Sequence, residues 1–164
     1  GCHTFLEAMQ RGLKNVEIKI IGDIDQVVSY KNELLKLSIG LKAEFLGLIK
    51  EKEVLFKYIA DTKYFIFPSY NEGMSNILLE VAALKTPIIC SDIVENKAVF
   101  IDGEVLFFKV GDSADLSEKI NWAINNGDAM QIKADNAYKT LQDKYEWDLI
   151  SYKYCEIINS FLKG

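Results

Sequence analysis

The sequence predicts an α/β fold with a doubly wound parallel sheet and flanking helices, and three observations support this prediction. Short apolar runs of the β type alternate with longer segments in which apolar residues recur at helical spacing. The connections between these segments are short, as they are in βαβ units. A glycine or serine follows three of the apolar runs, at Gly22, Gly47 and Ser69. Because the carboxyl ends of parallel strands share one edge of a sheet, we expect these residues to converge on one crevice.

The 164 residues predict a single domain, because a chain of this length buries roughly two thirds of the surface of its unfolded state. The net charge of −5 argues against a broad surface for nucleic acid or for an anionic membrane. No apolar run approaches the roughly 20 residues that span a bilayer, so no transmembrane segment is predicted. Cys2, Cys90 and Cys155 are interpreted as reduced thiols of a cytoplasmic protein, and His3 as an incidental residue near the chain end.

The first elements in order are a helix, a strand and a second helix. The first helix is predicted over His3–Arg11 and ends at Gly12. A strand follows over Val16–Ile21, and a turn at Gly22–Asp23 closes it. The second helix extends to Gly40, because apolar residues before that glycine repeat at helical spacing. These apolar residues are Val27, Tyr30, Leu34 and Leu37.

A short strand and a third helix come next. The strand is predicted over Ala43–Leu46 and is stopped by Gly47, and the helix covers about Glu51–Asp61. One face of this helix is apolar, with Val54, Leu55, Tyr58 and Ile59. Its basic residues are interpreted as a solvated face, namely Lys50, Lys52 and Lys57.

The stretch Tyr64–Asp92 is the one around which the chain is organised. It predicts a buried strand over Tyr64–Pro68, a polar loop over Ser69–Ser75, a helix over Asn76–Lys85 and a second strand over Thr86–Cys90. The order strand, loop, helix, strand is one βαβ unit, and its loop lies where such folds bind ligands.

The last part of the chain predicts one strand and three helices. The strand covers Val105–Val110, and Gly111–Ser113 caps the next helix. A further helix with weaker periodicity is predicted over Met130–Asp143. The final helix, Trp147–Leu162, is amphipathic and is interpreted as part of the core.

The chemistry of the chain is expected where the polar loop meets its helix. Ser75 is predicted to be the N-cap, with a side-chain oxygen that accepts a hydrogen bond from a free amide. Free backbone amides at the positive end of a helix dipole form a site for phosphate. The amides predicted to be free are those of Asn76, Ile77 and Leu78.

Two carboxylates flank this anion site, Glu72 before the helix and Glu80 on its second turn. Carboxylates repel phosphate, so a different role is expected for them. An ionised carboxylate accepts two hydrogen bonds side by side, which suits the vicinal hydroxyls of a ribose or a hexose. An anion site beside two diol acceptors predicts a site for a nucleotide sugar.

At these residues the sequence resembles the family 4 (group 1) retaining glycosyltransferases, which have the GT-B fold and build capsules, lipopolysaccharide and glycolipids. The residues that carry the resemblance are Pro68-Ser69, Glu72-Gly73, Leu79-Glu80, Ala82 and Pro87. The resemblance implies that residues 1–164 are the Rossmann-like donor-binding domain at the C-terminus of a GT-B enzyme. Such an enzyme transfers a sugar from a nucleoside diphosphate, with UDP as the expected carrier, to a glycan or lipid-linked acceptor in surface polysaccharide synthesis.

The resemblance also implies a role for each residue of the loop. Glu72 contacts the transferred sugar and is the candidate catalytic residue, and Glu80 binds the ribose hydroxyls. The turn at Gly22 lies near the phosphates. The backbone that holds sugar and phosphate is implied at Gly73, Met74, Ser75, Asn76 and Ile77, and the loop near the base at Gly47, Leu48 and Ile49.

Several parts of such an enzyme are not found in this sequence. We expect the acceptor-binding N-terminal domain, the first strand of the donor domain and a pair of basic residues to lie upstream. That strand is central in the family, so we expect either that its neighbours close the gap or that another chain fills it. The family usually has glycine at Lys85 and glutamate at Ala98, and the turn after Gly22 lacks the usual second glycine.

No metal site is predicted, because the sequence has neither an Asp-x-Asp motif nor a His/Cys cluster. No other cofactor is expected. The expected placement is cytoplasmic, with room for transient contact with the inner membrane through the missing domain. Two alternatives are a nucleotide-sugar epimerase of the GT-B fold and a degenerate binding module that transfers nothing.

Overall fold

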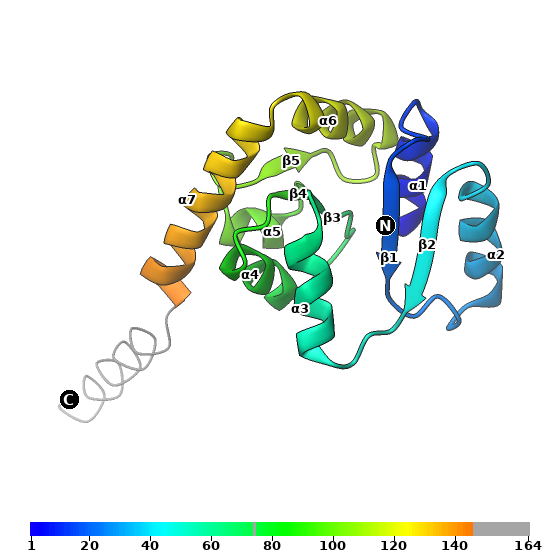
Figure 1. The fold of residues 1–164 in the computed structure, drawn as a ribbon, viewed down its shortest axis with the longest axis horizontal. Coiled ribbons are helices and arrows are strands. Elements are labelled where there is room, and N and C mark those ends of the chain that lie inside the picture. Colours follow the sequence, from blue (N-terminus) through cyan, green and yellow to red (C-terminus); the bar gives the residue numbers. More distant parts are fainter. Residues whose placement is uncertain (74, 146–164) are drawn as a thin grey trace.

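The computed structural model describes residues 1–73 and 75–145 (Figure 1). Met74, the predicted helix Trp147–Leu162 and Cys155 lie outside the described residues. In chain order the elements are α1 (Cys2–Gln10), β1 (Glu17–Ile21), α2 (Val28–Leu37), β2 (Lys42–Gly47), α3 (Lys52–Asp61), β3 (Phe65–Phe67), α4 (Asn76–Ala83), β4 (Ile88–Ser91), α5 (Val94–Val99), β5 (Leu106–Phe108), α6 (Ser113–Asn125) and α7 (Gly127–Tyr145).

The predicted alternation of parallel strands and helices is confirmed, but the strands form two sheets instead of one. β1 pairs with β2, and β3, β4 and β5 form a second sheet in that order, with every pairing parallel. In Figure 1, β1 and β2 lie on the right of the view and the three-stranded sheet lies further left. β1 and β3 share no hydrogen-bonded ladder in the described chain, so the neighbouring strands do not close the gap expected from a missing central strand.

Two apolar layers pack on opposite faces of these strands. The first joins both sheets to α1 and α6 through Ala8, Met9, Leu13, Ile18, Ile89, Phe108, Leu116, Ile120, Ala123 and Met130. The second lies under α3, α4 and α7 and consists of Ile59, Leu78, Val81, Ala82, Ile88, Cys90, Val99, Phe100, Val105 and Ala137. Because Ile89 belongs to one layer and Ile88 and Cys90 to the other, the alternation along β4 confirms the doubly wound architecture.

The structure corrects three helix predictions. The short helix α5 was not predicted, because six residues are too few to display a helical period. α7 extends beyond the predicted Met130–Asp143 at both ends. α4 ends at Ala83, before the predicted Lys85, because Lys85 has a left-handed backbone with φ of 54°. Among the helices that the structure describes, none has the length and apolar character needed to cross a membrane.

Candidate functional site

The turns after β1 and β2 lie side by side, as predicted. The amide of Gly22 donates a hydrogen bond of 2.9 Å to the carbonyl of Gly47, just beyond a register shift in the parallel pair. Both glycines have positive φ, 144° for Gly22 and 69° for Gly47, a conformation that favours glycine. The next residues turn outward, and Leu48 is 61% exposed while Ile49 is half-buried. An exposed apolar side chain at this edge fits the predicted contact with a base.

The loop after β3 is held by its own side chains. The hydroxyl of Ser69 donates to Oε1 of Glu72, and Glu72 is half-buried. This bond within the loop orients the carboxylate that the resemblance assigns to the transferred sugar. The neighbouring Gly73 is exposed, and an added Cβ there would meet no atom within 4 Å, so the backbone is open to an approaching ligand.

A buried polar network fastens both ends of this loop to β4 and α5. Ser91 donates from its hydroxyl to the carbonyl of Ser69 at 2.5 Å. Asn96 donates from Nδ2 to the carbonyl and hydroxyl of Ser91, at 3.0 and 3.3 Å, and accepts at Oδ1 from the hydroxyl of Ser75 at 3.2 Å. Ser91 and Asn96 are fully buried and Ser75 is 2% exposed. Sequence reasoning missed Asn96, because it lies on the unpredicted α5.

At the start of α4 the structure places Ser75 as predicted and corrects two other predictions. Ser75 is the N-cap, but its side chain makes no capping bond because its hydroxyl is directed to Asn96. The amide of Leu78 donates to the carbonyl of Ser75 at 3.0 Å, so it is not free. Among the described residues, the amides of Asn76 and Ile77 have no acceptor. These two donors remain at the positive end of the helix.

Glu80 does not stand alone on α4. The ammonium of Lys52, the first residue of α3, lies 2.7 Å from Oε1 of Glu80. Lys50, Lys52 and Lys57 are all exposed, as the predicted solvated face requires, and Lys52 makes this contact in addition. This contact brings the segment just after the Gly47 loop against the predicted ribose carboxylate.

His3 is likewise not incidental. Its Nε2 lies 3.1 Å from the hydroxyl of Tyr70 and its Nδ1 lies 3.2 Å from the hydroxyl of Tyr30. The ring also stacks on Tyr70 with a centroid distance of 5.6 Å, and Thr4 Oγ1 lies 2.8 Å from the same hydroxyl. The cluster ties the loop that carries Glu72 to α1 and α2.

Cys90 and Asp92, at the carboxyl end of β4, have environments that define their roles. Burial raises the pKa of the Cys90 thiol, so this cysteine is a neutral core side chain and not a nucleophile. The amide of Val110 donates to Asp92 at 2.9 Å and, with Lys97, lowers the pKa of the Asp92 carboxyl. Asp92 therefore stays ionised and ties β4 to the segment after β5.

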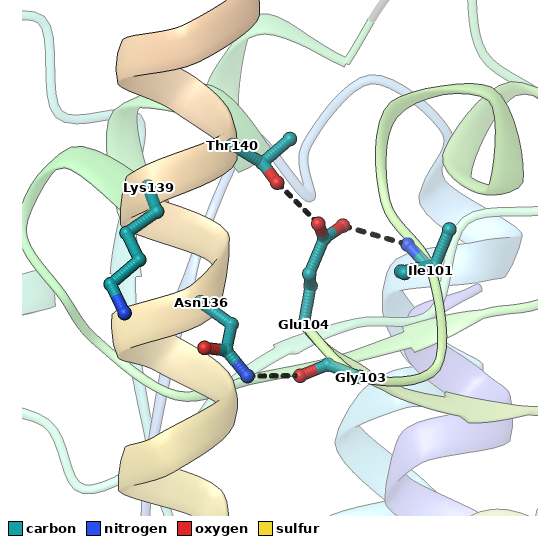
Figure 2. Close-up of a pocket in the computed structure, with 6 residues that line it drawn as sticks. All are labelled: Ile101, Gly103, Glu104, Asn136, Lys139 and Thr140. Atoms are coloured by element: carbon teal, nitrogen blue, oxygen red, sulfur yellow. Dashed lines mark hydrogen bonds between the residues drawn. The ribbon is translucent and has the colours of Figure 1, made fainter.

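A cavity of about 250 Å³ lies elsewhere, between the turn before β5 and α7 (Figure 2). Glu104 accepts from the amide of Ile101 at 2.9 Å and from the hydroxyl of Thr140, and Asn136 donates to the carbonyl of Gly103 at 3.1 Å. These polar groups satisfy one another and clamp α7 to the turn. The cavity lies near the amino end of β5, whereas doubly wound folds bind ligands at the carboxyl ends. It includes none of the predicted site residues.

Within the described ranges, no three His, Cys, Asp or Glu side chains lie together as a metal ion would require. The loop after β3 and the helices α3 and α4 carry two backbone amides, two carboxylates and one ammonium, and the ammonium contacts one of the carboxylates. Such an arrangement can hold a ligand that carries both phosphate and hydroxyl groups, by the amides and the carboxylates respectively.

Comparison with known proteins gives both a family and a fold. The family described as Glycosyl transferases group 1 matches residues 1–140. Over 158 residues the chain is 25% identical to the capsular polysaccharide biosynthesis glycosyltransferase CapM of Staphylococcus aureus, covering 91% of this chain and 39% of CapM. The chain spans less than half the length of the curated relatives it matches.

Two solved structures are similar in fold. HepE of Anabaena in complex with UDP-glucose has a TM-score of 0.84 at 19% identity, with 98% of this chain and 45% of HepE covered. The C-terminal domain of the group 1 glycosyl transferase LpcC from Francisella tularensis has a TM-score of 0.75 at 19% identity, with 90% of this chain and 80% of that domain covered. The likeness confirms the predicted fold, that of the C-terminal domain of GT-B enzymes.

Proposed function

Because the chain belongs to the group 1 glycosyltransferases, we propose that it is the donor-binding half of a retaining enzyme that uses a nucleoside diphosphate sugar. The observation that carries the proposal is the unit formed by β3, its loop and α4. In the sequence of this unit, Asn76 and Ile77, whose amides have no acceptor among the described residues, lie between Glu72 and Glu80. Each carboxylate is oriented by a hydrogen bond of its own, from Ser69 and from Lys52.

In the proposed mechanism the chain contributes charge stabilisation and positioning. The amides of Asn76 and Ile77 donate to the departing diphosphate and stabilise the negative charge that develops as the glycosidic bond breaks. Glu72 accepts from hydroxyls of the transferred sugar and Glu80 from the ribose, which fixes the donor for attack. The acceptor hydroxyl and any group that deprotonates it are assigned to the other half of the enzyme.

The donor and the acceptor are proposed from the relatives. HepE was solved with UDP-glucose, which supports a UDP-sugar as the donor. CapM is named for capsular polysaccharide biosynthesis and TuaC for teichuronic acid biosynthesis, which supports a glycan acceptor, and the name of a Campylobacter jejuni relative contains diphospho-undecaprenol, which supports a lipid-linked one. A cytoplasmic enzyme at the inner membrane fits these substrates. We assign the acceptor site to an N-terminal domain, since the curated relatives are more than twice as long as this chain.

The proposal is tested by titrating the full-length protein calorimetrically with UDP and GDP and by analysing the products formed from UDP-sugars. Glu80→Gln should weaken UDP binding by about 10-fold or more, because a hydrogen bond to a charged group contributes roughly 1.5–3 kcal/mol. Glu118→Gln is the matched control, since Glu118 is exposed on α6 and its loss removes the same charge. UDP affinity of this variant should equal that of the wild type.

Product analysis separates the proposal from the two alternatives. Transfer of the sugar to an acceptor with retained anomeric configuration supports the proposed enzyme. Release of an epimerised sugar would identify an epimerase, and binding of UDP-sugar without turnover on any acceptor would identify a degenerate module. Failure of the full-length protein to bind any nucleotide would contradict the donor site itself.

A further inference from the structure

The ion pair between Lys52 and Glu80 differs from the other short ion pairs of the described chain. It joins two helices across 28 residues of sequence at 2.7 Å. The other pairs at 3.0 Å or less, Lys31 with Asp25 and Lys97 with Asp92, connect residues six and five positions apart. The Lys52 pair therefore fixes one element against another, while these two stabilise local turns.

The position of Lys52 is unfavourable for its own helix. It is the first residue of α3, where the positive end of the helix dipole disfavours a cation. An exposed ion pair adds little to stability, and the Lys52 side chain is 71% exposed. The stability of α3 itself therefore does not explain a lysine at this position. The contact between Lys52 and Glu80 explains it.

Two contacts define where the ammonium lies. It donates to Oε1 of Glu80 and lies 5.9 Å from the centroid of the Phe56 ring, one turn further along α3. The Glu80 side chain is 26% exposed, so part of it remains open to a ligand. A carboxylate offers about four lone-pair sites, and Lys52 occupies one of them. Oε2 keeps its capacity to accept.

We propose that Lys52 is a positioning residue of the donor site, which holds Oε1 of Glu80 so that Oε2 faces the vicinal hydroxyls of the ribose. The inference rests on the proposed function, in which Glu80 binds that diol. It adds a residue from α3 to a site otherwise built from the turns after β1 and β2, the loop after β3, and α4. Lys52 also follows the Gly47–Ile49 loop by only a few residues, so the base loop and the ribose carboxylate are coupled through α3.

The test compares two ligands that differ only in the diol, UDP and 2′,3′-dideoxy-UDP, on the full-length protein. Lys52→Met should weaken UDP binding about 5-fold, within the range for residues that share one hydrogen-bond network. Its affinity for dideoxy-UDP should equal that of the wild type, because that ligand has no hydroxyls for Glu80. Lys52→Arg should restore most of the UDP affinity, since it keeps a donor near Glu80.

A double-mutant cycle completes the test. In the Glu80→Gln background, Lys52→Met should cause no further loss of UDP affinity, because Lys52 acts through the carboxylate. Lys57→Met is the matched control, as Lys57 is exposed on the same helix and has no ion pair among the described residues. UDP affinity of that variant should be unchanged.

The remaining outcomes overturn the inference. Unchanged UDP binding in Lys52→Met would mean that Lys52 has no effect on donor affinity. Tighter UDP binding would mean that Lys52 competes with the ribose for Glu80. Equal weakening of UDP and dideoxy-UDP would place its effect on the base or the phosphates and not on the diol. In each of these cases a loss of UDP affinity in Glu80→Gln leaves the proposed function standing. If Glu80→Gln binds UDP as well as the wild type, the ribose role of Glu80 fails, and the inference fails with it.

Discussion

β3 and β4 are neighbouring strands with similarly apolar sequences, yet they are buried to different extents. Every residue of β4, Ile88–Ser91, is buried, whereas every residue of β3, Phe65–Phe67, is only half-buried. Side chains of both strands enter both apolar layers, so the faces do not explain the difference. The number of paired strands explains the difference in burial, because β4 pairs with both β3 and β5, while β3 pairs with β4 alone. The alternation of apolar residues along a strand therefore indicates which faces of the strand are covered, but it does not indicate how many other strands pair with it.

The less buried strand carries the loop of the candidate site. The ends of that loop depend on β4 and α5, because Ser91 bonds to Ser69 and Asn96 bonds to Ser75 and Ser91. The site is thus built at a junction where β4 and α5 fix both ends of the loop that follows β3.

Replacing the central isoleucine of each strand with alanine gives the largest expected effect. Ile89→Ala should lower the free energy of unfolding by about 3–4 kcal/mol, because Ile89 is fully buried in a packed layer. Ile66→Ala, its partner in register on β3, should cost no more than about 2 kcal/mol, because part of its surface is already in water. Urea unfolding of both variants measures the difference.

Equal losses of unfolding free energy in Ile89→Ala and Ile66→Ala would contradict the difference in burial between β4 and β3. They would mean that the free edge of β3 is covered in solution. A smaller loss for Ile66→Ala, with unchanged denaturant dependence, supports the edge explanation.

Asn96→Ala tests whether β4 and α5 hold the loop of β3. The substitution leaves the buried Ser91 carbonyl and Ser75 hydroxyl without their partner, which should cost about 2 kcal/mol of unfolding free energy. Amide hydrogen exchange should accelerate in residues 69–75 but not in β4. Asn121→Ala is the control, because Asn121 is exposed and bonds only within α6, so its loss should change stability by less than about 0.5 kcal/mol. Slow exchange of the loop in Asn96→Ala would contradict the role of the network.

The features that could be predicted from the sequence are those whose residues lie close together along the chain. The strand, loop and helix around Glu72 and Glu80 are contiguous, so alternation, turn residues and family resemblance together identified them. Lys52, Asn96 and His3 were missed as partners of the site, because their contacts lie 28, 21 and 67 residues away. No local pattern reports such a distance, and the redirection of the Ser75 hydroxyl to Asn96 was missed for the same reason.

The division into two sheets was only partly predictable. The resemblance implied an absent central strand, but it left open whether β1 and β3 would meet. In the structure the two sheets are joined through the side-chain layer under α1 and α6 and not through backbone pairing. Side-chain packing of this kind depends on the volume between elements, which periodicity does not encode.

Lys85, in the connection between α4 and β4, gives the smallest expected effect. Its amide donates to the carbonyl of Ala82 and the amide of Thr86 donates to that of Val81, the two bonds of a Schellman motif. The left-handed position of that motif, φ of 54° here, favours glycine, which is the residue that the family resemblance led us to expect.

Lys85→Gly should therefore be more stable than Lys85→Ala by about 1 kcal/mol, because glycine adopts this conformation without strain. The alanine variant is the proper reference, since both substitutions remove the weak pair with Asp135 at 4.0 Å and the contact with the Tyr138 ring. Thermal unfolding of the two variants measures the difference. Because Lys85 precedes a strand that is buried throughout, its backbone cannot relax to a negative φ without displacing β4. Equal stability of Lys85→Gly and Lys85→Ala would mean that the backbone at Lys85 relaxes without cost. The segment that leads into β4 would then be no more firmly fixed than β3, contrary to the difference in burial between the two strands.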